Sequence, residues 1–416
     1  MTTIDTGRTL VADGALRARA EAVVPGGVYG HLRVTADRGM PPSYPQFFAR
    51  GSGARLWDVD GNEYVDLMCA FGPMVAGYAN PVVDAAARAQ LALGDALTGP
   101  GEKYVEYAER LVGTVAHADW AMFAKNGTDA TSMSVVIARA ATGRTKLLKA
   151  EKAYHGANPW FTPSTAGVVG SDRADIVEFD YDDLASLERA AASVEGDVAA
   201  IVVTPFRHDG FVDQHFPSAE FARGVRALAD RTGAALILDE VRTTFRVDLA
   251  GAWERFGVRP DLTAMSKALA NGHALSAVVG VDSLREAAAS IFVTGSFWMA
   301  GVPFAAAIAT LDWMVQTDGL TRMLDAGQVL RDGLQAQASA HGLGVVQTGP
   351  TSMPFLRFED EPRLETAIAF TDAAARRGVL VHPWHNMFVS AAHTPEDIAT
   401  VLERTDEAFA EVARSR

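Results

Sequence analysis

Short apolar runs alternate with amphipathic stretches through the middle of the chain, from about residue 72 to residue 310. One amphipathic stretch has clear helical spacing, because its apolar residues recur every three or four positions between Tyr104 and Val115. The apolar runs are short enough to be strands: Lys146–Lys149, Val198–Thr204, Ala234–Asp239, Leu262–Met265 and Ser276–Val281. Strands that alternate with helices in this way predict an α/β fold with a parallel sheet covered on both faces.

The two ends of the chain differ from the middle in the order of the helices and strands that their apolar residues predict. Near the start, Ala54–Leu67 predicts a β-hairpin, because two strand-like runs flank the tight-turn sequence Asp60-Gly61-Asn62. The last hundred residues predict a helix at about 320–340, strands near 345 and 355, a helix near 362–377, strands near 380 and 388, and a final helix. This α+β pattern predicts a small domain at 316–416 that also contains the N-terminal segment 1–70, beside a large domain at 71–315.

Composition argues against several kinds of binding partner and site. The net charge of −14 over 416 residues argues against nucleic acid or an anionic membrane surface as the main partner. Cys69 is the only cysteine, which excludes an intrachain disulfide and a cysteine-based zinc site, and no metal is predicted. No apolar stretch approaches the roughly 18 residues of a membrane-spanning helix, and Met1–Gly14 lacks the apolar core of a signal peptide. We therefore expect a cytoplasmic protein.

Four short motifs come in an order that suits one catalytic site, and the first two offer a phosphate site and an aromatic ring. Lys125-Asn126-Gly127-Thr128 precedes a helical stretch. Backbone N–H groups at a helix start, together with the helix dipole, favour an anion there, although an ordinary helix cap explains the same residues. Tyr154-His155-Gly156 follows a predicted strand. Its aromatic ring can stack on a flat ligand or simply belong to the core.

The other two motifs place charged side chains after strands. Leu236–Val241 is an apolar run that ends in Asp239 and Glu240, at the sheet edge where open α/β folds bind ligands. A metal pair, a general base or a helix cap also fits two such carboxylates. Met265–Gly272 sets Lys267 among small residues directly after a strand. A lysine that loses solvent there has a lowered pKa, as a Schiff-base lysine requires, whereas most lysines are solvated surface residues.

Together, these motifs resemble those of the class III (fold type I) aminotransferases, which use pyridoxal 5′-phosphate (PLP), and within them the glutamate-1-semialdehyde aminomutase-like branch. The resemblance extends from Pro25 to about Glu407, and its most specific parts are Asp239-Glu240-Val241 and Lys267. It implies an α/β, PLP-dependent transferase fold of type I. Such a fold has a large domain with a mostly parallel, seven-stranded-type sheet and a smaller α+β domain formed from both chain ends.

The resemblance also implies a role for each matching residue. Lys267 would carry PLP as a Schiff base and, once released by substrate, move a proton between substrate and cofactor. Asp239 would pair with the pyridine nitrogen, so that the ring accepts electrons. Tyr154 would stack on one face of the ring, and Val241 would pack on the other. Lys267, Asp239 and Tyr154 are thus the expected catalytic residues.

The phosphate contacts come from two segments. Gly127 and Thr128 would hold the phosphate through backbone N–H groups. Ser296, in Gly295-Ser296-Phe297, matches a hydroxyl that reaches the phosphate of the neighbouring subunit. The resemblance therefore implies a homodimer with shared active sites.

The substrate side is less well defined. Arg33 ends the segment Pro25–Arg33, which resembles one that carries a carboxylate-binding arginine, and the guanidinium fork matches a carboxylate. His385 stands where the aminomutase carries a glutamate near its substrate. Thr204-Pro205 stands where the family has Glu-Pro. Cofactor chemistry therefore transfers to this chain, but the identity of the substrate does not.

We expect an aminotransferase that moves an amino group from an amino donor, an amino acid by preference, to an oxo acid or aldehyde through pyridoxamine phosphate. The alternative is an intramolecular aminomutase of the glutamate-1-semialdehyde type, for which Ser164–Gly170 would be a mobile loop; the loss of the glutamate at His385 argues against it. A PLP-fold protein without catalysis is a third interpretation. It is disfavoured because Lys267 and Asp239 are both present.

Overall fold

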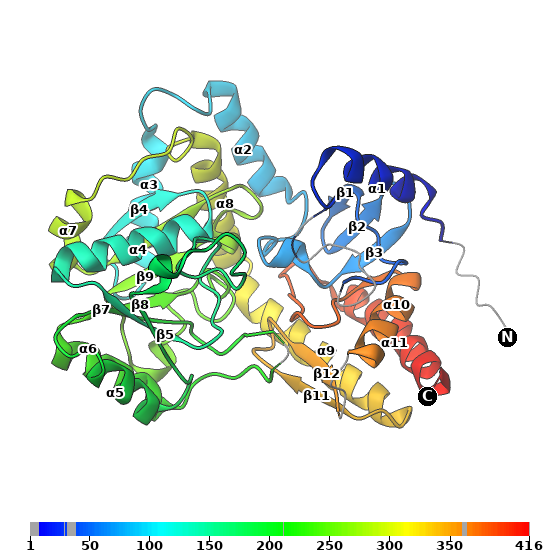
Figure 1. Cartoon of the computed structure of the whole chain (residues 1–416). Coiled ribbons are helices and arrows are strands. Elements are labelled where there is room, and N and C mark those ends of the chain that lie inside the picture. The colour runs from blue at the N-terminus through cyan, green and yellow to red at the C-terminus, as the bar shows by residue number, and fades with distance from the viewer. Residues whose placement is uncertain (1–7, 29, 31–38, 211, 360–363, 416) are drawn as a thin grey trace. The chain divides into compact units, whose positions relative to one another are not determined.

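A computed structural model describes residues 8–28, 30, 39–210, 212–359 and 364–415. The chain forms two compact units (Figure 1). The sheet unit is the continuous stretch Pro81–Leu320, and the terminal unit combines Met1–Asn80 with Thr321–Arg416. None of the helices within the described residues has both the length and the apolar character needed to cross a membrane.

Seven strands form the central sheet of the sheet unit, in the order β4-β10-β9-β8-β7-β5-β6. Their bounds are β4 (Trp120–Ala124), β5 (Lys146–Ala150), β6 (Ile176–Phe179), β7 (Val198–Val203), β8 (Ala235–Asp239), β9 (Leu262–Met265) and β10 (Ser276–Gly280). Only β10 runs against the others, because it pairs antiparallel with both β4 and β9. This sheet confirms the α/β fold with a mostly parallel, seven-stranded sheet.

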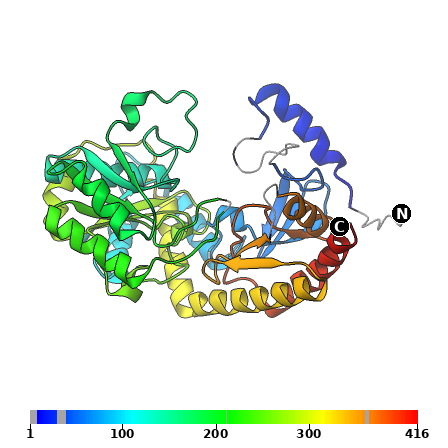
Figure 2. The ribbon, with the colours of Figure 1, turned by 60° about the horizontal axis from the view of Figure 1, so that its bottom comes forward.

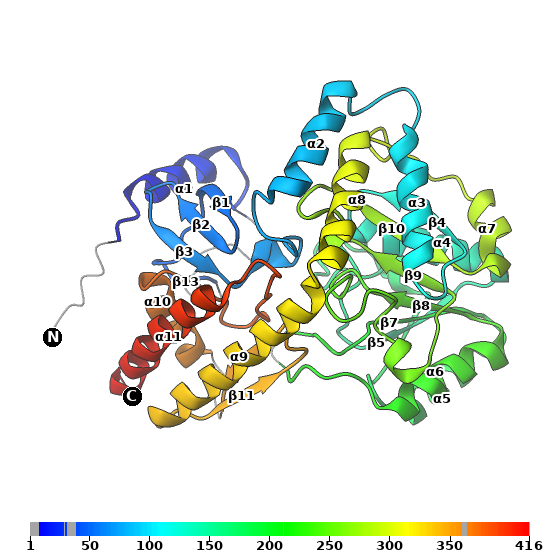
Figure 3. The same ribbon diagram turned by 180° about the vertical axis from the view of Figure 1, so that it is seen from behind.

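Helices cover both faces of this sheet, which explains why its strands are apolar without interruption. Leu147 and Ile237 pack on one face with α4, whereas the next residues along each strand, Leu148 and Leu238, pack on the opposite face with α6. Seen from behind, α3 and α8 cover part of that second face (Figure 3). The helices of this unit are α2 (Pro81–Leu93), α3 (Glu102–Thr114), α4 (Gly127–Thr142), α5 (Leu184–Ala192), α6 (Ala219–Thr232), α7 (Arg285–Ser290) and α8 (Gly301–Gln316).

The connection between β9 and β10 begins and ends at one edge of the sheet, because β10 returns antiparallel to β9. Ser266 follows β9, and its hydroxyl donates a hydrogen bond to the carbonyl of Leu275, just before β10, at 3.0 Å. Within this connection, Lys267 opens a short 3₁₀ turn, Lys267–Ala270, with a left-handed φ of 47°. The lysine therefore lies in a short segment whose two ends are pinned together.

The N-terminal half of the terminal unit contains the predicted hairpin. Strands β2 (Arg55–Asp58) and β3 (Glu63–Asp66) pair antiparallel, and β1 (Phe48–Ser52) and β13 (Val379–Leu380) complete a sheet of order β1-β2-β3-β13. The Asp58 carboxylate fixes the turn, because it accepts hydrogen bonds from the Asn62 backbone N–H at 2.8 Å and the Tyr64 hydroxyl at 2.9 Å. Helix α1 (Val11–Val23) precedes these strands.

The C-terminal half packs helices around a second hairpin. It comprises α9 (Gly319–Ala340), nearly all of which belongs to the terminal unit, β11 (Val345–Thr348), β12 (Phe355–Phe358), α10 (Glu365–Arg376) and α11 (Pro395–Ser415). The long helix α9 lies along the β11–β12 hairpin (Figure 2), and the Arg331 guanidinium donates to the carbonyls of Gln347 and Gly349 at 3.1 and 2.9 Å.

The strand expected near residue 388 does not form. The N–H groups of Met387 and Val389 bond to the carbonyls of Pro354 and Ser352, and the N–H of Phe388 between them bonds to the carbonyl of Leu67. The bonds alternate between two segments as they do in a strand, but neither Leu67 nor 352–354 belongs to a strand, so this apolar run is buried without joining a sheet.

Candidate active site

The predicted motifs of the sheet unit meet at one edge of its sheet. Strands β4, β5, β8 and β9 all run in the same direction, so their carboxyl ends share an edge. Gly127 follows β4, Tyr154 follows β5, Asp239 ends β8 and Lys267 follows β9. Motifs separated by up to 140 positions in the sequence are therefore brought to the edge where open α/β sheets bind ligands.

Helix α4 begins at this edge with a reciprocal cap. The Asn126 side chain accepts a hydrogen bond from the Asp129 backbone N–H at 3.1 Å, and the Asp129 carboxylate accepts from the Asn126 N–H at 3.1 Å. Gly127 has no room for a side chain, since a Cβ there would lie 2.6 Å from a methyl carbon of Val241. The start of α4 and the end of β8 are thus in direct contact.

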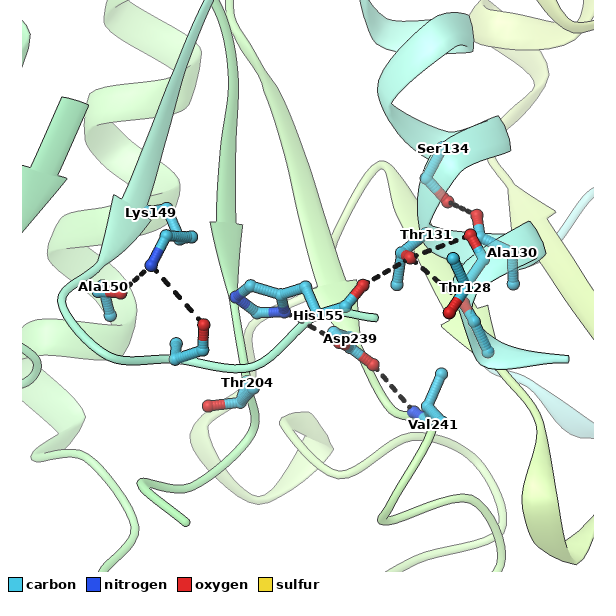
Figure 4. Close-up of polar contacts among 12 residues, drawn as sticks. Thr128, Ala130, Thr131, Ser134, Lys149, Ala150, His155, Thr204, Asp239 and Val241 are labelled. Atoms are coloured by element: carbon cyan, nitrogen blue, oxygen red, sulfur yellow. Dashed lines mark hydrogen bonds and ion pairs between the residues drawn. The ribbon is translucent and has the colours of Figure 1, made fainter. Parts of the chain in front are cut away.

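Asp239 is held by two donors (Figure 4). Its Oδ1 accepts a hydrogen bond from the Val241 backbone N–H at 3.0 Å, and its Oδ2 lies 2.7 Å from Nδ1 of His155. The His155 side chain is fully buried, and its carbonyl oxygen accepts a hydrogen bond from the Thr131 hydroxyl at 2.6 Å. The carboxylate therefore has a fixed orientation at the end of β8.

Tyr154 precedes His155 and differs from it in exposure. The tyrosine is 45% exposed, whereas the histidine is 1% exposed. Partial burial, followed by the charge of Asp239, raises the pKa of the Tyr154 hydroxyl, and Arg242 opposes this shift. An exposed aromatic ring beside a fixed carboxylate leaves a flat surface available for a ligand.

The pKa of Lys267 is lowered to about 7, mainly because its amine is withdrawn from solvent. The positive charges of Arg242 and Arg246 lower the pKa further, and Asp239 opposes them. An amine with this pKa is about half neutral at pH 7, in contrast to an ordinary lysine. Its left-handed backbone is uncommon for a residue with a side chain and is typical of strain held at functional sites.

Arg242 and His208 also belong to this cluster, and the sequence motifs did not single out Arg242 as a site residue. Burial lowers the pKa of Arg242 to about 10, against the opposing effects of Asp239 and Asp209. Burial, followed by the positive charges of Arg242 and Lys267, holds the pKa of His208 well below its usual value. Their positions in the sequence could have indicated this, because Arg242 lies three residues after Asp239 and His208 lies shortly after strand β7.

Glu240 is turned away from its neighbour Asp239. Its Oε1 accepts a hydrogen bond from the Ala252 N–H at 2.9 Å, and its Oε2 accepts from the Thr243 hydroxyl at 3.0 Å. Burial raises the pKa of Glu240 to about 7. Across the described part of the chain, no three His, Cys, Asp or Glu side chains are grouped as metal ligands. Glu240 therefore fixes the turn after β8, and Asp239 faces His155.

Three predicted residues remain: Ser296, His385 and Arg33. Ser296 is exposed between α7 and α8, beside Phe297, which is 68% exposed. His385 belongs to the terminal unit, where its ring packs edge-on to Phe71 at 5.3 Å between centroids. Arg33 lies outside the described residues. Within the sheet unit, the structure thus brings Gly127, Tyr154, Asp239 and Lys267 to one edge of the sheet.

Comparison with known proteins identifies the family. The model of the family Aminotransferase class-III matches residues 36–408. The chain belongs to the class III aminotransferases. It is 50% identical over 399 residues to the aminopentol aminotransferase of Sphingopyxis macrogoltabida, covering 96% of this chain and 94% of that protein. It is 35% identical over 427 residues to a glutamate-1-semialdehyde 2,1-aminomutase of Gemmatimonas aurantiaca, covering 95% of each.

A solved structure agrees with this assignment. The PLP internal aldimine form of the FumI protein from Sphingopyxis sp. MTA144 matches with a TM-score of 0.94 and 50% identity, over 97% of both chains. The protein is therefore a PLP-dependent aminotransferase, which confirms the predicted fold, cofactor and activity. The aminomutase alternative is disfavoured, because the aminomutase is less similar to the chain than the aminotransferase is.

The residues of the sheet edge fit PLP. An amine with a pKa of about 7 at Lys267 is suited to covalent attachment of an aldehyde. Asp239 is oriented by His155 and Val241 and is suited to a cationic ring nitrogen. The start of α4, where a Cβ on Gly127 would strike Val241, offers a cradle without side-chain bulk and a helix dipole for the phosphate.

Proposed function

We propose that this aminotransferase uses Lys267, Asp239 and Tyr154 as its catalytic residues and takes its amino group from an amine that carries hydroxyl groups. The observation that supports the first part is the pairing of two features at one sheet edge. Lys267 has a pKa lowered to about 7, and Asp239 is held by His155 at 2.7 Å. A neutral amine beside a fixed carboxylate meets the two needs of amino-group chemistry on PLP.

PLP supplies an aldehyde that captures amino groups and a ring that accepts negative charge. Lys267 Nζ would attach the cofactor, and after substrate binding its neutral amine would accept and return the proton at the substrate carbon. Asp239 would keep the ring nitrogen protonated, and Val241 and His155 hold its two oxygens in place. Tyr154 and Val241 would hold the ring between them.

The phosphate is assigned to two chains. Gly127 and Thr128 offer backbone N–H groups at the start of α4. Ser296 reaches the phosphate of the partner subunit, so the working enzyme is a homodimer with shared active sites. The exposure of Phe292 (91%) and Phe297 (68%), on the segment that carries Ser296, supports an apolar contact between subunits. We place this dimer in the cytoplasm, as the composition predicts.

The amino donor is proposed from the similarity to the aminopentol aminotransferase. The name of that enzyme denotes an amine with five hydroxyl groups, and the two sequences are 50% identical over 96% of this chain and 94% of that enzyme. Such a donor carries no carboxylate. An amino acid is the second candidate, and the segment Pro25–Arg33 supports it, because Arg33 would bind the carboxylate; His385 would then lie near the substrate.

Three donors that share a butane skeleton test this proposal: 2-aminobutane, 3-aminobutan-2-ol and 3-aminobutanoate. Each is supplied to the holoenzyme with pyruvate, and the alanine formed is measured. We expect kcat/KM for the amino alcohol to exceed that for the amino acid by about tenfold or more, because a site built for hydroxyls leaves a carboxylate poorly paired. Preference for 3-aminobutanoate, lost in Arg33→Ala, would favour the amino acid instead. Failure of all three donors would contradict the proposed donor classes.

A further inference from the structure

Lys149 lies near the end of β5, and its ammonium is bound inside the protein. Its ammonium donates to the carbonyls of Ala150 at 2.9 Å and Ala153 at 3.4 Å, and it forms an ion pair with Glu178 on β6 at 3.0 Å. The lysine side chain is 7% exposed, whereas that of Glu178 is 51% exposed. Two hydrogen bonds and one ion pair therefore hold this ammonium.

These contacts fix a turn that the local sequence does not favour. The turn closes when the Ala153 N–H donates to the Ala150 carbonyl at 3.2 Å, and Glu151 N–H is tied to Phe179 of β6 at 2.8 Å. Lys152 has a left-handed φ of 62° within it, which is costly for a residue with a side chain. Lys149 holds both ends of the turn, because Ala150 opens it and Ala153 closes it (Figure 4).

The chain continues from this turn directly into Tyr154 and His155. Beyond them it docks on α4: the Thr131 hydroxyl donates to the His155 carbonyl at 2.6 Å, and the Ala157 N–H donates to the Thr128 hydroxyl oxygen at 3.0 Å. The segment that carries both side chains is therefore fastened at its far end by α4 and at its near end by Lys149. His155 in turn holds Asp239 at 2.7 Å.

We propose that Lys149 is a positioning residue for amino transfer, which acts by holding the turn Ala150–Ala153 so that Tyr154 and His155 keep their places beside Asp239. The inference rests on the proposed roles of Asp239 and Tyr154. Lys149 need not touch substrate or cofactor for this purpose. Removing its ammonium leaves two carbonyls without this donor, so the near end of the segment is held only by the backbone bonds Ala153–Ala150 and Glu151–Phe179.

Lys146 provides a matched control on the same strand. Its ammonium also donates to a backbone carbonyl, that of Ala174, at 3.1 Å, and also pairs with a carboxylate, Asp175, at 2.9 Å. It differs by lying at the opposite end of β5, away from the site. The test compares Lys149→Met, Lys149→Arg and Lys146→Met as holoenzymes. The readouts are kcat per bound cofactor, visible circular dichroism of the bound cofactor, and thermal unfolding.

We expect Lys149→Met to lower kcat per bound cofactor by about tenfold and to weaken the visible dichroism, because small displacements of catalytic groups reduce rates strongly. Lys149→Arg, which keeps charge and donors, should recover part of both, and Lys146→Met should match the parent. If Lys149→Met lowers only the unfolding temperature, with kcat and dichroism like those of Lys146→Met, the lysine is merely structural and the inference is overturned.

Two further variants keep the outcome clear. Should Lys149→Met fail to fold, Glu178→Gln weakens the hold on the ammonium from a half-exposed position, and unchanged dichroism there would equally overturn the inference. Asp239→Asn separates this inference from the function on which it rests. Full activity of Asp239→Asn would refute the proposed function, whereas an impaired Asp239→Asn beside a fully active Lys149→Met would refute only the role of Lys149.

Discussion

Lys149 and Lys267 lie near the carboxyl ends of two parallel strands of one sheet, and both amines are withdrawn from solvent. Around Lys149 the protein supplies two carbonyl oxygens and a carboxylate. Around Lys267 it places the positive charges of Arg242 and Arg246, with Asp239 as the opposing charge, and the pKa falls to about 7. One environment holds the amine through hydrogen bonds and an ion pair, and the other lowers its pKa.

The difference shows that burial alone does not make a lysine reactive. A buried ammonium that is held by two carbonyls and a carboxylate cross-links the segments that carry them. A buried lysine beside two arginines is most stable when it gives up its proton. Sequence context near the two lysines is similar, since each follows an apolar run, so the distinction arises from side chains that only the fold brings close.

The largest expected effect is the loss of amino transfer in Lys267→Ala. We expect a fall in kcat of about a thousandfold or more, because the residue that attaches the cofactor and moves the proton is gone. Borohydride reduction followed by peptide mapping should locate the cofactor on Lys267 in the parent and find no fixed cofactor in the variant. An adduct mapped to Lys149 instead would show that Lys149, and not Lys267, carries the cofactor.

Asp239→Asn should have the next largest effect. The amide keeps the shape of the side chain but loses the charge that holds a proton on the ring nitrogen, so kcat should fall by at least about a hundredfold, roughly 2.7 kcal/mol of barrier. The same change removes the one negative charge that raises the pKa of Lys267. Steady-state kinetics with a good amine donor measure this effect, and a rate close to that of the parent would contradict it.

The lowered pKa of Lys267 should make both PLP uptake and stability depend on pH, with smaller effects than those of the two substitutions above. Covalent uptake of PLP by the cofactor-free protein requires neutral Lys267, so the rate should fall about tenfold per unit below pH 7 and level off above it. Since the folded pKa lies below the ordinary 10.5, the unfolded chain binds more protons between these values, and stability should rise with pH across that window. Stopped-flow absorbance and denaturant unfolding measure the two effects.

Arg242→Met sharpens this prediction. Removing one of the positive charges that lower the pKa of Lys267 should move the break in the uptake rate to higher pH. A break that stays near pH 7 would show that burial alone sets the pKa, and the contrast with Lys149 would then rest on hydrogen bonding rather than on charge.

The smallest effect is expected for Ser296→Ala. The proposed hydroxyl comes from the other subunit and makes a single contact, so the Kd for PLP should rise by about fivefold, while the dimer persists. Dialysis against a PLP trap, with light scattering for the oligomeric state, measures both. If Ser296→Ala retains PLP as well as the parent does, the phosphate is not held by the partner subunit, and the cofactor site is limited to the sheet edge of one subunit.

The grouping of the candidate site residues was predictable because they follow strands, and parallel strands carry their neighbours to one edge. The meeting of Gly127, Tyr154, Asp239 and Lys267 at that edge follows from this rule. The hydrogen bond between His155 and Asp239 was not, since nothing in the sequence specifies which side chains of two loops face each other. The apolar run near residue 388 was predicted as a strand because hydrophobicity reports burial, but it does not report whether the neighbouring segments are strands themselves.

The antiparallel return of β10 has a consequence for the precision of Lys267. In a regular α/β crossover, the chain after a strand returns to the opposite edge of the sheet through a helix, so a residue at the start of this connection lies on a long and flexible segment. Here the segment from Ser266 to Leu275 is short, and its ends are closed on each other by a hydrogen bond and by the β9–β10 ladder. Little conformational entropy remains for it to lose, so the amine is already confined before any ligand arrives.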